Sequence, residues 1–317
     1  NYLSTNQDIV GVYSSVAYYL DPHEPDNLKK DLQSWDLIFD LDSHLDEGES
    51  RYDHISRMSA VTLQLIDDHL VSEFGFDIED MKIAWSGNKG FHVTLDDQKY
   101  RDISRASRTK LLNHMKMEGI IDRGLYNDSN QTVNSVCGGW KKRYHQTISD
   151  TLALSYDQNA LIEYGYPKVT AKKICDLLED EGNYLSLEAG RLKILTDKDP
   201  KLLDSIKRVC KKKRKGLIDS IDAPVSTKPF GIFRVPNSIH EKSGLPCVRL
   251  QYEDLKSSQK IIETMWKSLG TDLVEINLEH PVTIEYDKEY ELEPGIQMVP
   301  RYIAIPVLVK LTSSIGR

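Results

Sequence analysis

The first third of the chain alternates short apolar segments with one longer segment of helical periodicity. Residues 36–42 read Asp-Leu-Ile-Phe-Asp-Leu-Asp, which predicts a buried strand that ends in alternating carboxylates. Apolar residues at helical spacing predict a helix over residues 56–74. Two more strands are expected at 82–85 and 91–95, with a glycine-containing turn between them. In such a turn, backbone amides and basic side chains can face a phosphate.

In the remaining two thirds of the chain, the predicted secondary structure changes from helices to strands. Residues 101–210 read as mostly helical, and short strands with turns return over residues 217–247. The apolar stretch 302–311 fits either a helix or a strand. The pattern predicts an α+β fold with a discontinuous core, residues 1–105 and 211–317, and an inserted, mostly helical subdomain over residues 106–210. A chain of 317 residues is long enough for such a division.

Composition narrows the class of protein. Apolar residues make up 39% of the chain and charged residues 28%, which is ordinary for a soluble globular protein. No apolar run has the length of a membrane span, and the chain shows no basic-then-apolar leader. We therefore expect an intracellular protein with no membrane partner, in a cytoplasm or nucleoid, or in a nucleus if the host is eukaryotic.

The four cysteines are widely separated, at positions 137, 175, 210 and 247. No Cys-x-x-Cys pair is present, so the spacing supports neither a zinc knuckle nor a disulfide framework. We expect reduced thiols and no zinc.

Charge is unevenly distributed. The net charge of −8 argues against indiscriminate binding of nucleic acid, but residues 207–215 form a strongly basic stretch. Its candidate DNA contacts are Lys211, Lys212, Lys213 and Arg214. A solvated helix face is the alternative interpretation of this stretch.

Asp40 and Asp42 are the first candidates for chemistry. They lie two residues apart on a predicted strand, so their carboxylates project to the same side and can bind hard divalent cations. A solvated acidic pair at a strand end is the alternative. Because the strand is otherwise apolar, however, burying the pair is costly unless cations or hydrogen-bond donors compensate.

Phosphoryl transfer by two divalent cations usually needs a third carboxylate from a distant segment. Asp222, on a short apolar strand before Pro224, is the best candidate, and Asp219 is its rival. The alternative for Asp222 is a turn residue that precedes a proline.

Two groups of cationic and polar residues could bind phosphate. Ser86, Lys89 and His92 lie along one turn, in which Gly87 and Gly90 permit a tight approach. An ordinary hairpin turn followed by a packed histidine is the alternative. The second group, in a later loop, consists of Arg234, His240 and Lys242. Its alternative is a solvated loop.

Four segments in this order resemble the small subunit of archaeo-eukaryotic primase. They are Phe-Asp-Leu-Asp at 39–42, Ser-Gly-Asn-Lys-Gly-Phe-His at 86–92, Ile-Asp-Ala-Pro-Val-Ser at 221–226, and Arg-Val-Pro-Asn-Ser-Ile-His-Glu-Lys-Ser-Gly-Leu at 234–245. The flanking segments 12–19, 68–76 and 299–304 resemble the family too, so that the similarity covers most of the chain.

The resemblance implies a primase-type mixed α/β catalytic core with a helical subdomain. It also implies a DNA primase or primase-polymerase that copies single-stranded DNA from NTPs or dNTPs and pairs with a large subunit. Asp40, Asp42 and Asp222 would bind two Mg²⁺ or Mn²⁺ ions. The residues implied to bind the nucleotide are Ser86, Gly87, Asn88, Lys89, His92, Ile232, Arg234, Ser238, His240 and Lys242.

The chain also departs from the family. A Cys/His zinc module usually follows the aspartate pair, but residues 43–59 contain no cysteine, and Lys89 replaces the usual arginine of the phosphate turn. Such losses fit a repair, translesion or mobile-element primase-polymerase that mainly extends strands as well as a replicative subunit. An inactive, DNA-binding scaffold subunit is the alternative from another class of function.

Overall fold

The computed structural model describes residues 11–26, 29–118 and 139–315, with side chains described up to residue 311. The expected thiol of Cys137 lies outside these ranges. The chain divides into two compact units, which we describe separately. The first contains residues 1–64, 77–109 and 219–317, and the second contains residues 65–76 and 110–218. The subdomain boundary predicted at residue 106 did not anticipate that residues 65–76 belong to the second unit.

The first unit is built on a four-stranded antiparallel sheet in the order β4-β6-β5-β8. These strands are Leu37–Asp42, Gly90–Leu95, Met81–Trp85 and Val248–Leu250. Asp40 pairs with His92, which in turn pairs with Ala84 on the next strand. The register therefore puts Asp40, Asp42 and His92 on one face of the sheet.

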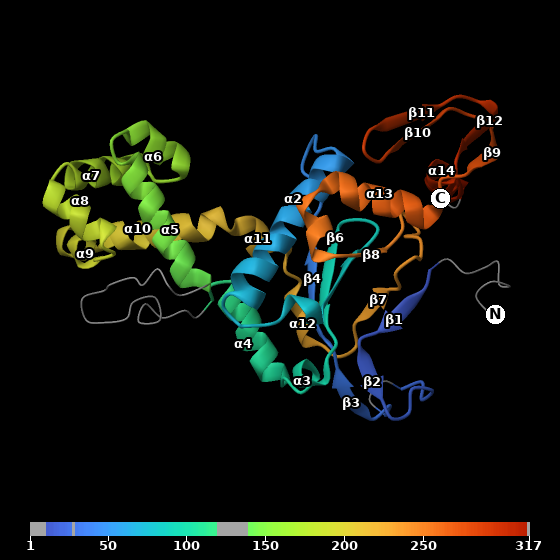
Figure 1. Cartoon of the computed structure of the whole chain (residues 1–317), viewed down its shortest axis with the longest axis horizontal. Helices are drawn as coiled ribbons and strands as arrows, with labels where there is room; N and C mark the ends of the chain where they lie inside the picture. The colour runs from blue at the N-terminus through green and yellow to red at the C-terminus, as the bar shows by residue number, and fades with distance from the viewer. Residues whose placement is uncertain (1–10, 27–28, 119–138, 316–317) are drawn as a thin grey trace. The chain divides into compact units, whose positions relative to one another are not determined.

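The opposite face of the sheet carries the core. Phe39, Leu41, Phe91, Val93 and Trp85 on this face are all fully buried. Helices α2 (Arg51–Gln64) and α13 (Ser258–Leu269) pack along the sheet (Figure 1). Helix α2 begins where the Ser50 hydroxyl accepts a hydrogen bond from the Asp53 amide, 3.0 Å away. Polar strand residues are thus left for the other face.

Two small elements lie toward that polar face. Strand β1 (Tyr13–Ser15) pairs with β7 (Ile232–Arg234), so Tyr13 stands opposite Arg234. The short helix α12 (Ala223–Thr227) packs against β4. The residue before it, Asp222, follows a single bridge between Leu41 and Ile221 and does not lie on the strand expected from the sequence. It caps α12 instead.

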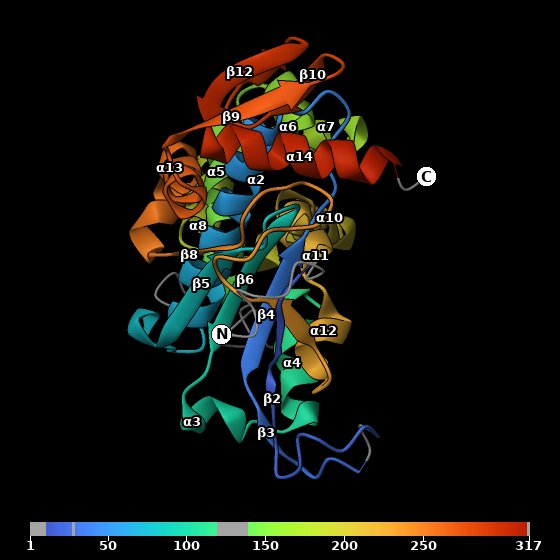
Figure 2. The same cartoon turned by 90° about the vertical axis from the view of Figure 1, so that its right-hand side faces the viewer.

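The other elements of the first unit surround this centre. They are β2 (Ala17–Tyr19), β3 (Leu32–Trp35), the 3-10 helices η2 (Ile78–Asp80) and η4 (Tyr252–Lys256), α3 (Gln98–Arg101), α4 (Arg105–Met115), β9 (Leu273–Leu278), β10 (Val282–Glu285), β11 (Glu289–Leu292), β12 (Gly295–Pro300) and α14 (Arg301–Ile315). Helix α4 crosses the boundary between the units at residue 109. Figure 2 shows α14 running alongside the β9–β12 ribbon, which it contacts.

In the described part of the second unit, the secondary-structure elements are helices joined by turns and loops. It contains the π-helical segment η1 (Leu65–Val71), α5 (Gly139–Leu154), α6 (Gln158–Tyr164), α7 (Lys168–Leu178), α8 (Glu181–Glu188), α9 (Lys193–Lys198), α10 (Pro200–Lys213) and most of α11 (Lys215–Ser220). Its core is a cluster of buried side chains that includes Trp140, Tyr144, Leu161 and Ile206.

The expected mixed α+β class is confirmed by these elements. The helix expected over 56–74 begins at Arg51, because Ser50 provides a cap, and becomes π-helical from Leu65. The ambiguous stretch 302–311 is helical, within α14. None of the helices within the described ranges is long and apolar enough to cross a bilayer.

Arg108 fixes the chain where β3 leads into β4. Its side chain is fully buried and lies 4.3 Å over the ring of Trp35. The guanidinium donates to the carbonyls of Asp36 (2.7 Å) and Trp35 (2.8 Å), while Nε donates to that of Ile103 (2.9 Å). Burial lowers the pKa of Arg108 to about 10, so the group remains charged at neutral pH.

Replacing this arginine tests its structural role. We expect Arg108→Met to destabilise the fold by about 3 kcal/mol, because buried carbonyls lose their donors. Urea unfolding measures the change. Arg105→Met, at an exposed position of the same helix, should change stability by less than about 0.5 kcal/mol. Equal effects of the two substitutions would contradict the assignment.

Candidate active site

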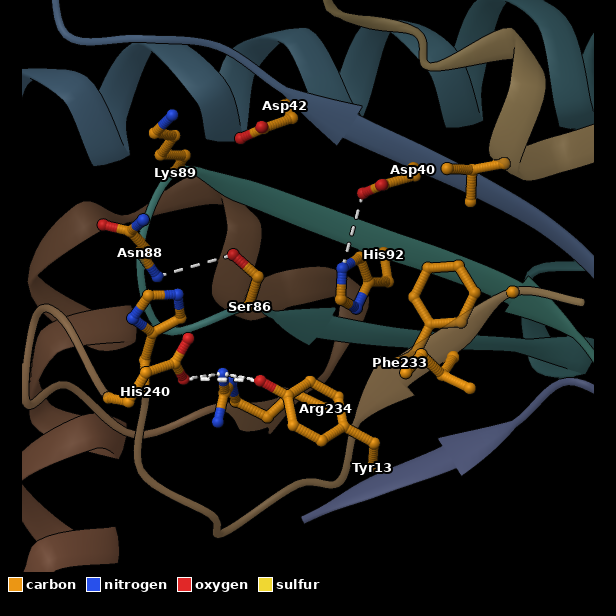
Figure 3. Close-up of a pocket in the computed structure, with 14 residues that line it drawn as sticks. Tyr13, Asp40, Asp42, Ser86, Asn88, Lys89, His92, Phe233, Arg234 and His240 are labelled. Carbon is orange, nitrogen blue, oxygen red and sulfur yellow. Dashed lines mark hydrogen bonds and ion pairs between the residues drawn. The ribbon is translucent and has the colours of Figure 1, made fainter. Parts of the chain in front are cut away.

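The acidic pair projects from the end of β4 into a cavity of about 390 Å³ (Figure 3). Asp40 is partly buried and Asp42 is exposed, while Phe39, which precedes the pair, and Leu41, which lies between its members, are fully buried in the core. Nε2 of His92, on the neighbouring strand, lies 3.4 Å from Oδ1 of Asp40. Because successive side chains of β4 point to opposite faces of the sheet, the apolar residues lie in the core and the two carboxylates lie in the cavity.

Asp222 lies beside Asp40. Its amide donates to the Asp40 carbonyl at 2.9 Å, and its charge raises the pKa of Asp40. The rival Asp219 is exposed on α11 and is not among the groups that shift this pKa. Oδ1 of Asp222 accepts from the Val225 amide at 3.3 Å, as the cap of α12.

The three carboxylates do not form a ready-made metal site. Over the described ranges, no group of three or more His, Cys, Asp or Glu side chains is placed to hold a metal ion. The three carboxylates are thus close enough to influence one another electrostatically, but their oxygens do not converge on one point. Asp222 is near enough to Asp40 to repel it, but its carboxylate is engaged in the helix cap.

Burial is the main cause that raises the pKa of Asp40 to about 7, and the charges of Asp42 and Asp222 raise it further. A carboxyl group in this setting favours its neutral form unless positive charge is nearby. Hard cations favour oxygen ligands of this kind. The donor set at this end of β4 therefore fits a divalent cation in chemistry and in charge.

The turn between β5 and β6 is organised by its own serine. The Ser86 hydroxyl oxygen accepts from the amides of Asn88 (3.4 Å) and Gly90 (3.2 Å). Ser86, Asn88 and Lys89 line the cavity, and Nζ of Lys89 lies 3.5 Å from Nε2 of His44. A cationic side chain and a polar turn thus face the acids across one cavity.

Both glycines of this turn are needed for close backbone contacts. A Cβ at Gly90 would lie 1.7 Å from the carbonyl oxygen of Leu41 on β4. Gly87 has a φ of +89°, and a Cβ there would meet the Leu245 carbonyl oxygen at 2.9 Å. The glycines therefore let the turn pack against β4 and against the loop of His240, a role distinct from the expected approach to a phosphate.

His92 is held in its neutral form. Burial, followed by the positive charge of Arg234, lowers the pKa of His92 to about 4. Its ring meets the Phe233 ring edge-on, with centroids 4.8 Å apart. The imidazole can therefore exchange a hydrogen bond with Asp40 without adding a charge.

His240 lies on a tight loop across the cavity. Its Nδ1 accepts from the amides of Lys242 (3.2 Å) and Ser243 (3.4 Å), which leaves the ring proton on Nε2. Burial lowers the pKa of His240, although the charge of Glu241 opposes that shift. The result is a neutral imidazole with a fixed donor.

Arg234 is already paired, which the sequence did not predict. Its guanidinium donates to Tyr13 Oη (2.5 Å), to the Ile239 carbonyl (2.8 Å) and to the Glu241 carboxylate. Glu241 also accepts from Tyr13 Oη at 3.3 Å. Tyr13 and Glu241 both line the cavity but were not among the expected site residues. The sequence signal for this pairing was Glu241 itself, an acidic residue directly after His240 in a segment of otherwise basic candidates.

The structure brings most of the candidates together, but not all of them. Those that line the cavity are Asp40, Asp42, Ser86, Asn88, Lys89, His92, Ile232, Arg234 and His240. Those that do not line it are Gly87, Asp222, Ser238 and Lys242. Ser238 donates to the Val235 carbonyl at 2.6 Å, and the Lys242 side chain is exposed.

The basic candidates belong to the second unit. Lys211, Lys212 and Lys213 are exposed on the last turn of α10, where positive charge also stabilises the helix end. Nζ of Lys213 lies 3.9 Å from the centre of the Tyr164 ring. Arg214 lies 3.7 Å from Asp68, so its charge is partly neutralised.

Comparison with known proteins identifies the family. A model of the DNA primase small subunit matches residues 39–252. The DNA primase small subunit PriS of Methanococcoides burtonii is 27% identical over 96% of this chain and 82% of its own length. The corresponding figures are 27%, 96% and 82% for PriS of Haloarcula marismortui, and 26%, 93% and 79% for that of Picrophilus torridus. The chain belongs to the DNA primase small subunit family.

The raised pKa of Asp40 makes stability depend on pH. In the unfolded chain the group titrates near 3.8 and in the fold near 7, so ionisation destabilises the fold. This cost is small below pH 4, grows between pH 4 and 7, and is complete above pH 7. In a chelator, Asp40→Asn should be more stable than the wild type by up to about 4 kcal/mol at pH 8, and about equally stable at pH 4.

Urea unfolding at several pH values measures this difference. Asp219→Asn, at the exposed acid that rivalled Asp222, serves as the matched control and should show no such trend. A difference between Asp40→Asn and the wild type that stays constant from pH 4 to 8 would refute the electrostatic account.

Proposed function

We propose that this chain is a template-directed nucleotidyltransferase that makes primers on single-stranded DNA from NTPs or dNTPs. The observation that supports this proposal is the cavity that gathers Asp40, Asp42, Lys89, Arg234 and His240. Carboxylates suited to cations and donors suited to phosphates face one another across it. Membership of the primase small subunit family fits the same activity.

Asp40, Asp42 and Asp222 are the residues that would hold two Mg²⁺ or Mn²⁺ ions. Such cations lower the pKa of the attacking hydroxyl and neutralise the leaving pyrophosphate. The repulsion that Asp42 and Asp222 exert on Asp40 favours cation binding, because positive charge relieves it. Since Asp40 must be ionised to bind a cation, affinity should rise as the pH rises through 7.

The triphosphate would lie against Lys89 and His240. Lys89 supplies a point charge, and the Nε2 proton of His240 supplies a neutral donor in a fixed direction. Arg234 would add its guanidinium on separating from Glu241. Ile232, which lines the cavity and is 64% exposed, would contact the sugar or base, and the exposed Lys242 would contribute from the rim.

Partners follow from the same activity. We propose single-stranded DNA as template, with Lys211–Lys213 as salt-sensitive contacts to its phosphates, and a large primase subunit as protein partner. We also propose that residues 43–59 need no zinc. Arg57, on α2, already ties the residues before that helix to it, donating to Glu49 at 2.6 Å and to the His44 carbonyl at 3.0 Å.

The decisive experiment is nucleotide incorporation on unprimed single-stranded DNA. We expect incorporation that requires Mg²⁺ or Mn²⁺ and that falls by about a thousandfold or more in Asp40→Ala and Asp42→Ala, because the cations lose their ligands. Asp219→Ala, which removes a nearby exposed acid, should retain activity.

Two other outcomes would redirect the proposal. Extension of primed templates with no synthesis on unprimed ones would favour the strand-extending alternative. DNA binding without any incorporation, in a folded protein supplied with either metal, would favour the scaffold alternative and defeat the proposal.

Because Arg234 is paired with Glu241, a substitution of Glu241 should increase the affinity for nucleotide. Glu241→Gln removes the charge that competes with a triphosphate for the guanidinium. We expect the KM for nucleotide to fall about threefold to tenfold, in line with the strength of charge-assisted hydrogen bonds. Steady-state kinetics on a fixed template measure the change. In an Arg234→Met background the same substitution should have no effect, and a raised KM in Glu241→Gln alone would show that Glu241 orients Arg234 instead.

A further inference from the structure

Three side chains bind the backbone carbonyls of the turn between β5 and β6. The carbonyl oxygens of Gly87, Asn88 and Lys89 each accept a hydrogen bond from a side chain outside the turn. Their donors are Ser243 Oγ at 2.6 Å, Arg51 Nη1 at 2.6 Å and His54 Nε2 at 2.9 Å. We call Arg51, His54 and Ser243 the carbonyl clamp.

His54 is the most deeply buried member of the clamp. It is fully buried, and because a carbonyl can only accept, its proton must lie on Nε2. Its Nδ1 lies 3.2 Å from Glu49 and 3.1 Å from Arg57, and these two residues are themselves paired. Arg57 holds the pKa of Glu49 at about 2. The ring is therefore fixed at both nitrogens.

Arg51 and Ser243 approach the turn from two different segments. The Arg51 amide donates to Glu285 at 2.6 Å, which anchors the first turn of α2, while the side chain reaches Asn88. Ser243 lies on the loop of His240, and its hydroxyl also accepts from the Leu245 amide at 3.2 Å. The clamp thus joins the turn to α2 on one side and to the His240 loop on the other.

Because the peptide bond is planar, the clamp also fixes the direction of the backbone amides in the turn. In a trans peptide the carbonyl and the next amide point in opposite directions, so fixing three carbonyls fixes the amides of Asn88, Lys89 and Gly90. The Asn88 and Gly90 amides donate to Ser86. Across the described ranges, the Lys89 amide has no protein acceptor.

The Ser86 hydroxyl is oriented by the same arrangement. Its oxygen accepts two amide hydrogen bonds, so its own proton is available to donate away from the turn. Ser86 and Lys89 both line the cavity. The turn therefore offers one hydroxyl and one amide in fixed directions, in addition to the Lys89 ammonium.

We propose that Arg51, His54 and Ser243 are positioning residues for the nucleotide, which hold the Ser86 hydroxyl and the Lys89 amide toward the triphosphate. They touch neither nucleotide nor cation and act through the backbone of the turn. This proposal rests on the proposed function, because it assigns the turn to the triphosphate. It predicts a defect in nucleotide binding that is separate from any defect in chemistry or template binding.

The test compares loss of each donor with its conservative replacement. His54→Leu and Ser243→Ala remove donors, whereas His54→Gln keeps an N–H that can reach the carbonyl. We expect His54→Leu and Ser243→Ala each to raise the KM for nucleotide about fivefold to tenfold, since each removes one buried hydrogen bond. The kcat at saturating nucleotide and the Kd for template DNA should stay within about twofold, and His54→Gln should recover most of the loss.

Ser56→Ala, at an exposed position of α2, is the matched control, and circular dichroism checks the fold of every variant. A folded His54→Leu or Ser243→Ala protein with the wild-type KM overturns the proposal. So does an equal loss of template binding, or a His54→Gln protein as impaired as His54→Leu. If His54→Leu does not fold, Ser243→Ala decides.

Failure of the proposed function gives a different result. Binding of a fluorescent nucleoside triphosphate is measured with Ca²⁺ in place of Mg²⁺. A wild-type protein that shows no binding defeats the proposed function, and the role of the clamp with it. If the wild-type protein binds the nucleotide and the clamp variants bind it equally well, the proposed role of the clamp is wrong but the proposed function stands.

Discussion

The backbone of β4 is hydrogen bonded on both sides, and the rest of the site depends on this constraint. Strand β6 pairs with it along one edge, and the Asp222 amide donates to the Asp40 carbonyl on the other. Main-chain bonds thus bring Asp222 next to an acidic pair that it repels. The fold tolerates this repulsion because the apolar residues on the opposite face of the strand are buried. Their burial stabilises the sheet whatever the charge state of the acids.

The turn between β5 and β6 is the second point on which the site depends. It has close backbone contacts with β4 through Gly90 and with the His240 loop through Gly87. Its carbonyls are bound from α2 and from the same loop. One short turn therefore contacts β4, α2 and the His240 loop, which are far apart in the sequence, and so places the acids relative to the polar groups of the turn.

The parts of the site that could be predicted from sequence are those set by local pattern. The strand with Asp40 and Asp42 and the turn after Trp85 follow from alternation and from glycine. The pairing of Arg234 with Tyr13 and Glu241 could not be predicted, because it depends on the β1–β7 register. The donors to the turn also left no local signal, since His54 lies before the helix predicted over residues 56–74 and its acceptor is a main-chain carbonyl. Asp222 could be proposed as a third acid, but its role as the cap of α12 could not, because a strand was expected where the structure has only a single bridge before that helix.

Two of the bases that line the cavity, His92 and His240, are neutral, and this affects the charge balance of the site. Asp40, Asp42 and Glu241 stand against Lys89 and Arg234, so the residues alone offer a polyanion no net positive charge. Burial lowers the pKa of both His92 and His240, and each imidazole then contributes hydrogen bonds without charge. Protonated histidines would pair with the carboxylates and compete with cations for them. A site that keeps its histidines neutral leaves the carboxylates available, and on the proposed function the positive charge that a triphosphate requires would then be supplied by the divalent cations.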